Sequence, residues 1–157
     1  MKIIITVLTL LLFMSALGLA EDILQQYDLT LGIRTVDTSG ILGKRQFPLK
    51  FQIRNLSHDS LEGEAIINLF FKGNLFVKEP TGEVKFKEFS RTWRTMIPST
   101  LDYGESTESP VYADPIDFFK FSQSGRYLLW WQIDQNRSNV LVFDYQNGKL
   151  KLFESSK

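Results

Sequence analysis

The chain has 157 residues, of which 43% are hydrophobic and 23% are charged, and its 18 basic residues balance its 18 acidic ones. This composition is typical of one folded domain, and it lacks the excess of basic residues that nucleic-acid-binding proteins carry. Because the chain contains no cysteine, a disulfide framework, a zinc–thiolate site, an iron–sulfur cluster and a thiol nucleophile are excluded.

Residues 1–20 have the pattern of a secretory signal peptide. An apolar stretch runs from Ile3 to Met14, and Gly18 and Ala20 place small residues just before a cleavage site. We therefore expect a mature domain of residues 21–157 that is secreted or periplasmic and has no membrane attachment after cleavage. The alternative is an uncleaved anchor, because the leader is at the lower length limit of a membrane span.

Apolar and polar residues alternate along most of the mature chain. Leu49, Phe51 and Ile53 are separated by Lys50 and Gln52, a spacing typical of a half-buried strand. The predicted strands, in chain order, span residues 27–33, 47–53, 65–71, 75–77, 84–89, 91–97, 111–112, 118–121, 127–133, 140–145 and 150–153.

The run from Ala65 to Phe71 is almost continuously apolar, so we interpret it as a strand that is covered on both faces. No segment of the mature chain carries a convincing helical repeat. Glycine-containing turns separate the strands, and Asn147-Gly148 predicts a two-residue hairpin between 140–145 and 150–153. The fold class we predict is therefore all-β: a single antiparallel β-sandwich of about eight to ten short strands.

One stretch narrows this prediction. The segment from Phe121 to Leu129, read Phe-Ser-Gln-Ser-Gly-Arg-Tyr-Leu-Leu, resembles the approach to the penultimate strand of immunoglobulin-like and fibronectin type III-like sandwiches. In those folds a tyrosine at the place of Tyr127 bonds to upstream backbone, and a cysteine often stands where this chain has Leu129. The resemblance implies an immunoglobulin-like sandwich whose last strand is 140–145, and it implies no functional residues.

Catalytic candidates are few. The only histidine is His58, and its neighbours Ser57 and Asp59 cannot form a triad with it, because triad members converge from separate elements. Glu62 and Glu64 would share one face of a strand, where a solvated surface is the simplest interpretation. A carboxylate-dependent hydrolase is the weakest alternative, and its candidate residues are Glu62, Glu64, Asp114 and Asp117.

Two charged segments can each be interpreted either as a binding site or as an ordinary solvated surface. The acidic stretch 102–117 holds carboxylates that could gather around calcium, although the order typical of a calcium loop is missing. We expect no cofactor and no metal, and we interpret this stretch as a solvated loop. Lys85 and Lys87 fit the water-facing side of an edge strand, and with Arg91 and Arg94 they leave open the binding of an anion or a polysaccharide.

The aromatic residues give the most useful prediction. Trp130 and Trp131 must point to opposite faces of one strand, and both faces of that strand carry apolar residues. One face is the core, and the other needs a cover: the 98–117 segment, the N-terminal residues, a partner protein, a glycan, or a second copy of the chain. The predicted binding surface comprises Trp93, Trp130, Trp131 and Tyr145.

These observations lead to one main hypothesis and one alternative of a different class. The main hypothesis is an exported, non-enzymatic binding or scaffolding domain whose partner is a protein or a glycan, not a nucleic acid. The alternative is a secreted protease inhibitor that presents the loops Glu79–Gly82 and Tyr103–Gly104. The glycosylation acceptor pattern also occurs at Asn55 and at Asn136, and it matters only in a host that glycosylates.

Overall fold

The computed structural model describes residues 26–34, 47–88, 98–109 and 114–155. The predicted leader, the predicted strands 91–97 and 111–112, and Trp93 lie outside the described residues. The described chain is mostly β and its sheets are antiparallel, in agreement with the all-β class predicted from the sequence.

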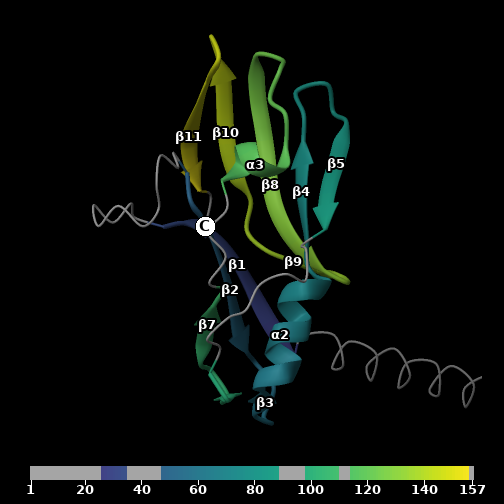
Figure 1. The fold of residues 1–157 in the computed structure, drawn as a ribbon, viewed down its shortest axis with the longest axis vertical. Helices are drawn as coiled ribbons and strands as arrows, with labels where there is room; N and C mark the ends of the chain where they lie inside the picture. The colour runs from purple at the N-terminus through teal and green to yellow at the C-terminus, as the bar shows by residue number, and fades with distance from the viewer. Residues whose placement is uncertain (1–25, 35–46, 89–97, 110–113, 156–157) are drawn as a thin grey trace, which may run out of the picture.

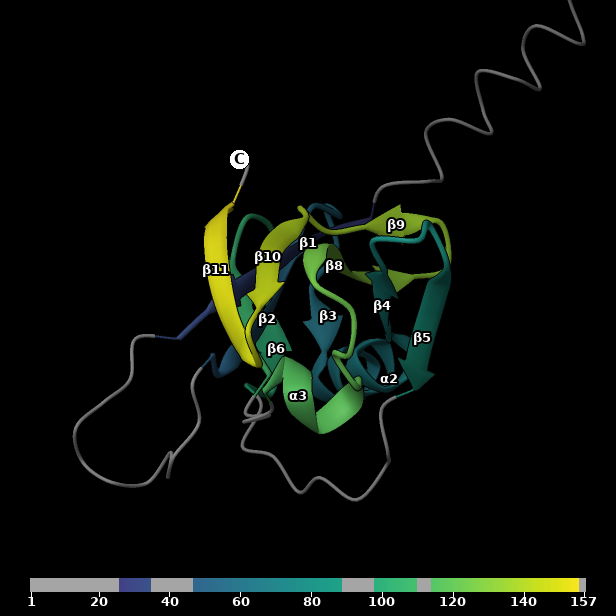
Figure 2. The same cartoon turned by 90° about the horizontal axis from the view of Figure 1, so that it is seen from above.

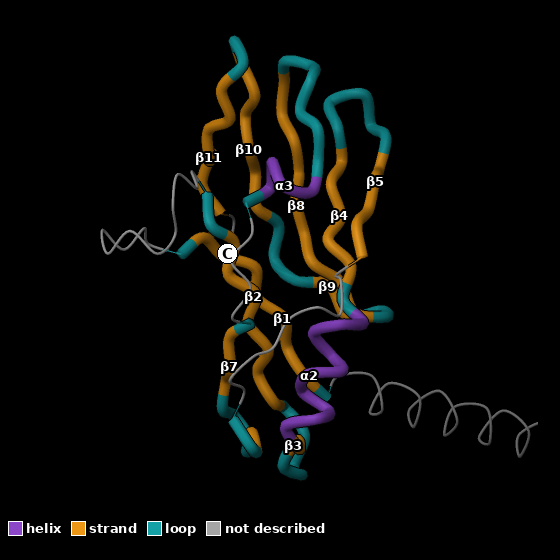
Figure 3. The backbone as a smooth tube through the Cα atoms, in the orientation of Figure 1, coloured by secondary structure: helices purple, strands orange, loops and turns teal. Residues whose placement is uncertain are grey.

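Two main sheets carry the fold (Figures 1 and 3). The smaller sheet has the order β1-β2-β7, with β1 at Tyr27–Ile33, β2 at Leu49–Asn55 and β7 at Ser106–Glu108. The larger sheet has the order β11-β10-β8-β4-β5, and its strands are β4 at Asn74–Lys78, β5 at Val84–Glu88, β8 at Gly125–Ile133, β10 at Leu141–Gln146 and β11 at Lys149–Ser155.

Short elements complete the described fold. The strand β9 (Asn136–Arg137) pairs with β8, and β3 (Leu61–Glu62) pairs with β6 (Thr100–Leu101). There are two helices in the described residues, α2 at Gly63–Lys72 and α3 at Pro115–Phe118. Figure 2 shows the large sheet as a curved layer, with α3 on the inner side of the curve.

The core fills the space on the inner side of the large sheet, and aromatic rings dominate it. Trp131 of β8 is completely buried between Phe51 of β2, whose ring centroid is 5.4 Å away, and Phe70 of α2, at 5.7 Å. Gly73, which follows α2, lies directly against the indole nitrogen of Trp131. The chain has no cysteine and therefore no disulfide, and buried aromatic rings such as these contribute a large share of its apolar core.

The prediction of a strand over 65–71 was wrong, because these residues belong to α2. Ile66 and Phe70, four residues apart, are buried, whereas Glu64 and Asn68 face away from the core. That spacing is the repeat of an amphipathic helix. The remaining apolar residues of the run are half-buried or exposed, and they hid the helical repeat in the sequence.

The predicted strand over 118–121 was also wrong, since α3 ends at Phe118 and no strand follows it directly. Asp114 caps this helix. Its carboxylate accepts a hydrogen bond from the amide of Ile116 at 3.4 Å, and the carboxylate of Asp117 accepts one from the amide of Asp114 at 2.9 Å. Pro115 suits the first turn, where its missing N–H costs no hydrogen bond.

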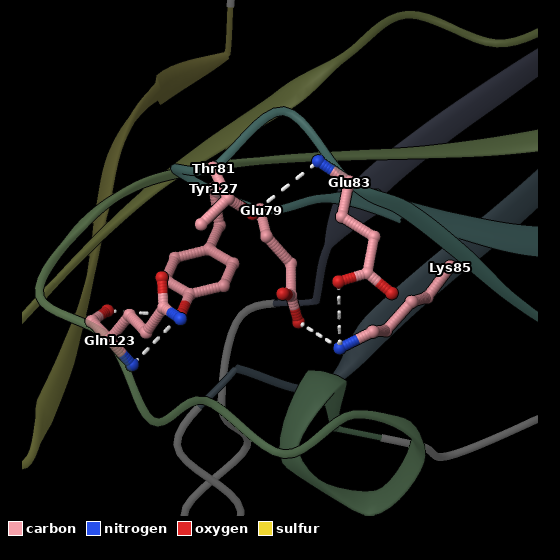
Figure 4. A network of polar contacts seen from close by, with 6 residues as sticks. All are labelled: Glu79, Thr81, Glu83, Lys85, Gln123 and Tyr127. Carbon is pink, nitrogen blue, oxygen red and sulfur yellow. Dashed lines mark hydrogen bonds and ion pairs between the residues drawn. The ribbon is translucent and has the colours of Figure 1, made fainter.

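Two local predictions were confirmed. Asn147 and Gly148, with φ angles of 52° and 74°, form the turn between β10 and β11. The hydroxyl of Tyr127 donates to the carbonyl of Gln123 at 2.9 Å and accepts from the amide of Gln123 at 3.2 Å (Figure 4). The tyrosine therefore bonds to upstream backbone, as the resemblance to immunoglobulin-like domains implied.

The side chain of Asn55 is a structural clamp at the end of β2. It is completely buried, its amide donates to the carbonyls of Asp59 at 2.8 Å and Leu101 at 2.9 Å, and its oxygen accepts from the amide of Ser57 at 2.8 Å. Because this amide is buried and hydrogen-bonded, a glycan cannot be attached to Asn55 in the folded protein.

Candidate functional site

The structure separates the two neighbouring tryptophans as the alternation predicted. Trp131 faces the core, whereas Trp130 points to the outer face of the large sheet and is 8% exposed. Tyr145 lies on the core side, because it is paired with the buried Leu150 and its ring is 6.4 Å from that of Tyr127. Trp93 lies outside the described residues, and of the other three residues predicted for a binding surface only Trp130 lies on the outer face of the sheet.

Three aromatic rings and one guanidinium group stack in a row across four strands of the outer face. We call this row the outer ladder: Phe86, Phe76, Trp130 and Arg137. The rings of Phe76 and Trp130 are parallel, with centroids 5.4 Å apart, and Phe86 follows at 5.7 Å from Phe76. The guanidinium carbon of Arg137 lies 4.1 Å from the centre of the Trp130 ring, a cation–π contact. Both faces of the Trp130 ring are therefore occupied, and a sugar ring cannot stack on it in this arrangement.

The exposed end of the outer ladder is the edge strand β5. Every residue of β5 is exposed, and Val84 and Phe86 retain 50% and 58% of their surface. They face outward because they pair with Lys78 and Phe76, which also point away from the core. The sequence did not predict this exposure, since the alternation with lysines suggested that the apolar side of the strand would be covered.

Lys85 and Lys87 lie on the other face of β5, and both are exposed as expected. The ammonium group of Lys85 lies 2.7 Å from the carboxylate of Glu79 and 3.7 Å from that of Glu83 (Figure 4). The hydrogen bond to Glu79 is the main cause of a raised pKa at Lys85, so this lysine stays charged at neutral pH. Within the described residues Lys87 has no acidic partner within 4 Å.

A shallow hollow of about 420 Å³ lies on the same outer face, between the β4–β5 turn and the beginning of β8. Lys78, Thr81, Arg126 and Leu128 are among its lining residues. Arg126 is held over the ring of Phe153, with its guanidinium carbon 5.0 Å from the ring centre. Within the described residues neither Lys78 nor Arg126 forms an ion pair.

The carboxylates suggested for catalysis are not brought together. Glu62 lies in β3 and Glu64 in the first turn of α2, so the expected shared strand face does not exist. Asp114 and Asp117 cap α3, and the other oxygen of Asp114 accepts a hydrogen bond from the amide of Phe47 at 2.7 Å. Asp114 and Asp117 thus serve together as the cap of α3, whereas Glu62 and Glu64 belong to other elements.

The acidic stretch 102–117 is likewise divided among different partners. The amide of Asp102 donates to the carboxylate of Glu105 within one turn, whereas Glu108 forms ion pairs with Arg34 and Lys50. Across the described parts of the chain, no group of three or more potential metal ligands converges.

The only histidine lies in an exposed polar turn. The hydroxyl of Ser57 accepts a hydrogen bond from the amide of Asp59 at 3.2 Å, and the His58 ring stacks on Tyr103 with centroids 5.4 Å apart. The β6–β7 turn that carries Tyr103 lies at the opposite end of the molecule from the β4–β5 turn (Figure 1). The two loops suggested for protease inhibition therefore do not meet at one end.

Intramolecular cover of the outer face was one expectation. In the described part of the 98–117 segment, β6 pairs with β3, β7 pairs with β2, and Phe118 at the end of α3 packs on the core. None of these elements lies over the outer ladder.

Comparison with protein-family models, with curated proteins and with solved structures finds no match to this chain. Among the described residues, neither helix has the length and apolar character needed to cross a bilayer.

Proposed function

We propose that this chain is an exported, non-enzymatic domain of immunoglobulin-like topology that binds a partner protein along β5. The strand order supports the topology. Immunoglobulin domains place strands A, B and E in one sheet and strands G, F, C and C′ in the other. The orders β1-β2-β7 and β10-β8-β4-β5 follow that arrangement in chain sequence, with Tyr127 at the start of the strand that corresponds to F.

This chain departs from that arrangement in two places. Helix α2 is inserted between the strands that correspond to B and C, and β11 extends the second sheet beyond the strand that corresponds to G. Export is supported by the leader pattern of residues 1–20. Mass spectrometry of the protein recovered outside the cytoplasm tests export, and the mature chain should begin at Glu21. A mature protein that retains residues 1–20 would contradict cleavage of the leader.

The observation that supports binding is the exposure of Val84 and Phe86 on an edge strand. A sheet edge offers unpaired backbone N–H and C=O groups, and exposed apolar side chains on such an edge favour pairing with another chain. Folded proteins usually protect this kind of edge. Here the two apolar side chains remain half-exposed, and Phe86 is the exposed end of the outer ladder.

Charge selects the kind of partner. Two copies of β5 paired antiparallel around Phe86 would place Lys85 of one copy opposite Lys87 of the other, and like charges in that position are unfavourable. A partner strand with apolar residues on one face and acidic residues on the other avoids this repulsion. Its apolar side chains would lie beside Val84 and Phe86 on the outer face, and its acidic side chains would lie beside Lys87 on the inner face. We therefore propose an extended acidic–apolar segment of another protein as the partner.

The test is a titration of the purified protein with a synthetic peptide of alternating glutamate and valine, followed by fluorescence anisotropy and backbone amide shifts. A peptide of alternating lysine and valine is the control ligand. We expect saturable binding of the acidic peptide alone, with amide shifts concentrated in 84–88. Phe86→Ala should weaken binding at least tenfold, and Lys87→Glu should reverse the preference between the two peptides.

The matched control is Phe153→Ala, because Phe153 is also 58% exposed and lies on the opposite edge strand, β11. This substitution should leave peptide binding unchanged. Equal weakening by Phe86→Ala and Phe153→Ala, or no binding of the acidic peptide, would refute the proposed surface. Non-enzymatic function is supported by the use of Asp114 and Asp117 as the cap of α3 and by the stacking of His58 on Tyr103.

A further inference from the structure

We infer that the hollow between the β4–β5 turn and β8 is an oxyanion-binding subsite for a small solute that carries a carboxylate or a phosphate group. Its volume of about 420 Å³ is within the range of small-molecule sites, roughly 300–1,000 Å³. This inference does not rest on the proposed protein partner, because the lining residues come from β4, the β4–β5 turn and β8 rather than from the free edge of β5.

Two uncompensated cations line the hollow. Lys78 and Arg126 are exposed, and within the described residues no carboxylate lies within 4 Å of either charged group. Glu79, which is adjacent to Lys78 in the chain, also lines the hollow, but its carboxylate lies 2.7 Å from the ammonium group of Lys85 on the other face of β5. Lys85 therefore compensates the negative charge of Glu79.

Two other acids lie near the hollow. Glu83 follows the lining residue Gly82, and its carboxylate lies 3.7 Å from the ammonium group of Lys85. Asp144 lies opposite Arg126 in the pairing of β10 with β8, but its carboxylate accepts a hydrogen bond from the side-chain amide of Gln146 at 3.0 Å. Lys151 lies opposite Asp144 on its other side. Around the hollow the four cations Lys78, Lys85, Arg126 and Lys151 therefore outnumber the three acids Glu79, Glu83 and Asp144 by one positive charge.

The Arg126 side chain makes a cation–π contact with a ring of the edge strand β11. Its guanidinium lies over the ring of Phe153, and this contact restricts the side chain before any ligand binds. A planar guanidinium can donate two parallel hydrogen bonds to a carboxylate or a phosphate, which an ammonium group cannot do.

The wall of the hollow is built by a close backbone approach. Gly125 has a φ angle of 139°, and a Cβ atom there would meet the ring of Pro80 at 2.9 Å, so the start of β8 lies directly against the β4–β5 turn. The hydroxyl of Thr81 accepts a weak hydrogen bond from the amide of Glu83 at 3.4 Å, which leaves its proton available for an anion. Leu128 supplies an apolar surface for the rest of a ligand.

The experiment is a calorimetric titration of the purified protein with inorganic phosphate and, separately, with galacturonate, at low and at moderate salt. Binding of either ligand that salt weakens supports the subsite. The ligand with the higher affinity shows whether the subsite prefers phosphate or a carboxylate. Arg126→Ala and Lys78→Ala should each weaken binding at least tenfold. Arg126→Lys keeps the charge but loses the planar fork, so it should weaken binding nearly as much.

The control is Lys149→Ala, which removes an exposed lysine of β11 that does not line the hollow. It should bind as the unaltered protein does, and thermal unfolding of every variant verifies that the fold is retained. Phe86→Ala should also leave anion binding unchanged, which separates this inference from the proposed partner surface. No binding of either ligand, or equal weakening by Lys149→Ala and Arg126→Ala, would overturn the inference.

Discussion

Replacing Gly73 by alanine tests how tightly the core is packed around Trp131. A Cβ atom at residue 73 would lie 2.0 Å from the indole nitrogen of Trp131 and 2.7 Å from its Cε2 atom. Ordinary contact begins at 3.4 Å, so the ring or the backbone would have to move by about 1.4 Å. The ring has no room to move, because Phe51 and Phe70 pack against it.

The expected cost follows from two opposing effects. Forcing extra volume into a packed core costs about 3 kcal/mol when the neighbours cannot rearrange, near the upper end of the usual range. Replacing glycine also lowers the entropy of the unfolded chain, which returns about 0.5–1 kcal/mol, and Gly73 has an ordinary φ of −68° that alanine adopts without strain. We therefore expect Gly73→Ala to lower the free energy of unfolding by about 2 kcal/mol.

Urea unfolding followed by tryptophan fluorescence measures this change, and for a domain of this size the melting temperature should fall by about 6–8 °C. The matched control is Gly32→Ala in β1, where the nearest atoms to a Cβ are the Lys50 side-chain carbons at 3.9 Å. That variant should be as stable as the unaltered protein or slightly more stable. If Gly73→Ala unfolds at the same urea concentration as Gly32→Ala, the proposed steric conflict with Trp131 is wrong.

Three further predictions test other parts of the fold. Asn55→Ala should lower the free energy of unfolding by about 2–3 kcal/mol, because it removes three hydrogen bonds of a completely buried side chain, including the buried one to the carbonyl of Leu101; a loss below about 0.5 kcal/mol in urea unfolding would contradict the clamp. Tyr127→Phe keeps the ring but removes both hydrogen bonds to Gln123, so about 1 kcal/mol should be lost, and an unchanged urea midpoint would argue against a structural role for the hydroxyl. Burial raises the pKa of Tyr27 above its ordinary value, an effect that a hydrogen bond from a neighbouring amide side chain partly offsets. The neutral phenol is therefore favoured by folding, and its stabilisation is complete below pH 10 and lost as the pH rises through the raised pKa. The decline in unfolding free energy above pH 10 should be smaller in Tyr27→Phe, and identical declines would contradict this assignment.

Much of the strand pattern could be predicted from the sequence. The alternation in 127–133 and 140–145 correctly divided the side chains of β8 and β10 between two faces, because successive side chains of a strand point to opposite faces, but it did not say which face is the core. Asn147-Gly148 correctly predicted a hairpin, since both residues accept the positive φ angles that the turn requires. These features depend only on neighbouring residues.

The outer ladder and the hollow could not be predicted in the same way. Phe86, Phe76 and Trp130 meet because of the register between β5, β4 and β8. The pairing of Phe76 with Trp130, for example, joins two residues that are 54 positions apart in the chain. Nothing in the local sequence of any one strand specifies that register. The proximity of Lys78 to Arg126 is decided at the same level, by the pairing of β4 with β8.

What the sequence by itself determined is the local geometry: extended strands with two distinct faces, tight turns, and a tyrosine whose hydroxyl reaches upstream backbone. What only the tertiary structure decided is which side chains are covered. The run 65–71 became a helix because its Ile66 and Phe70 side could pack on Trp131 and its neighbours. Val84 and Phe86 stayed exposed because β5 is the last strand of its sheet among the residues that the structure describes. Burial depends on elements distant in sequence, and short-range periodicity carries no information about them.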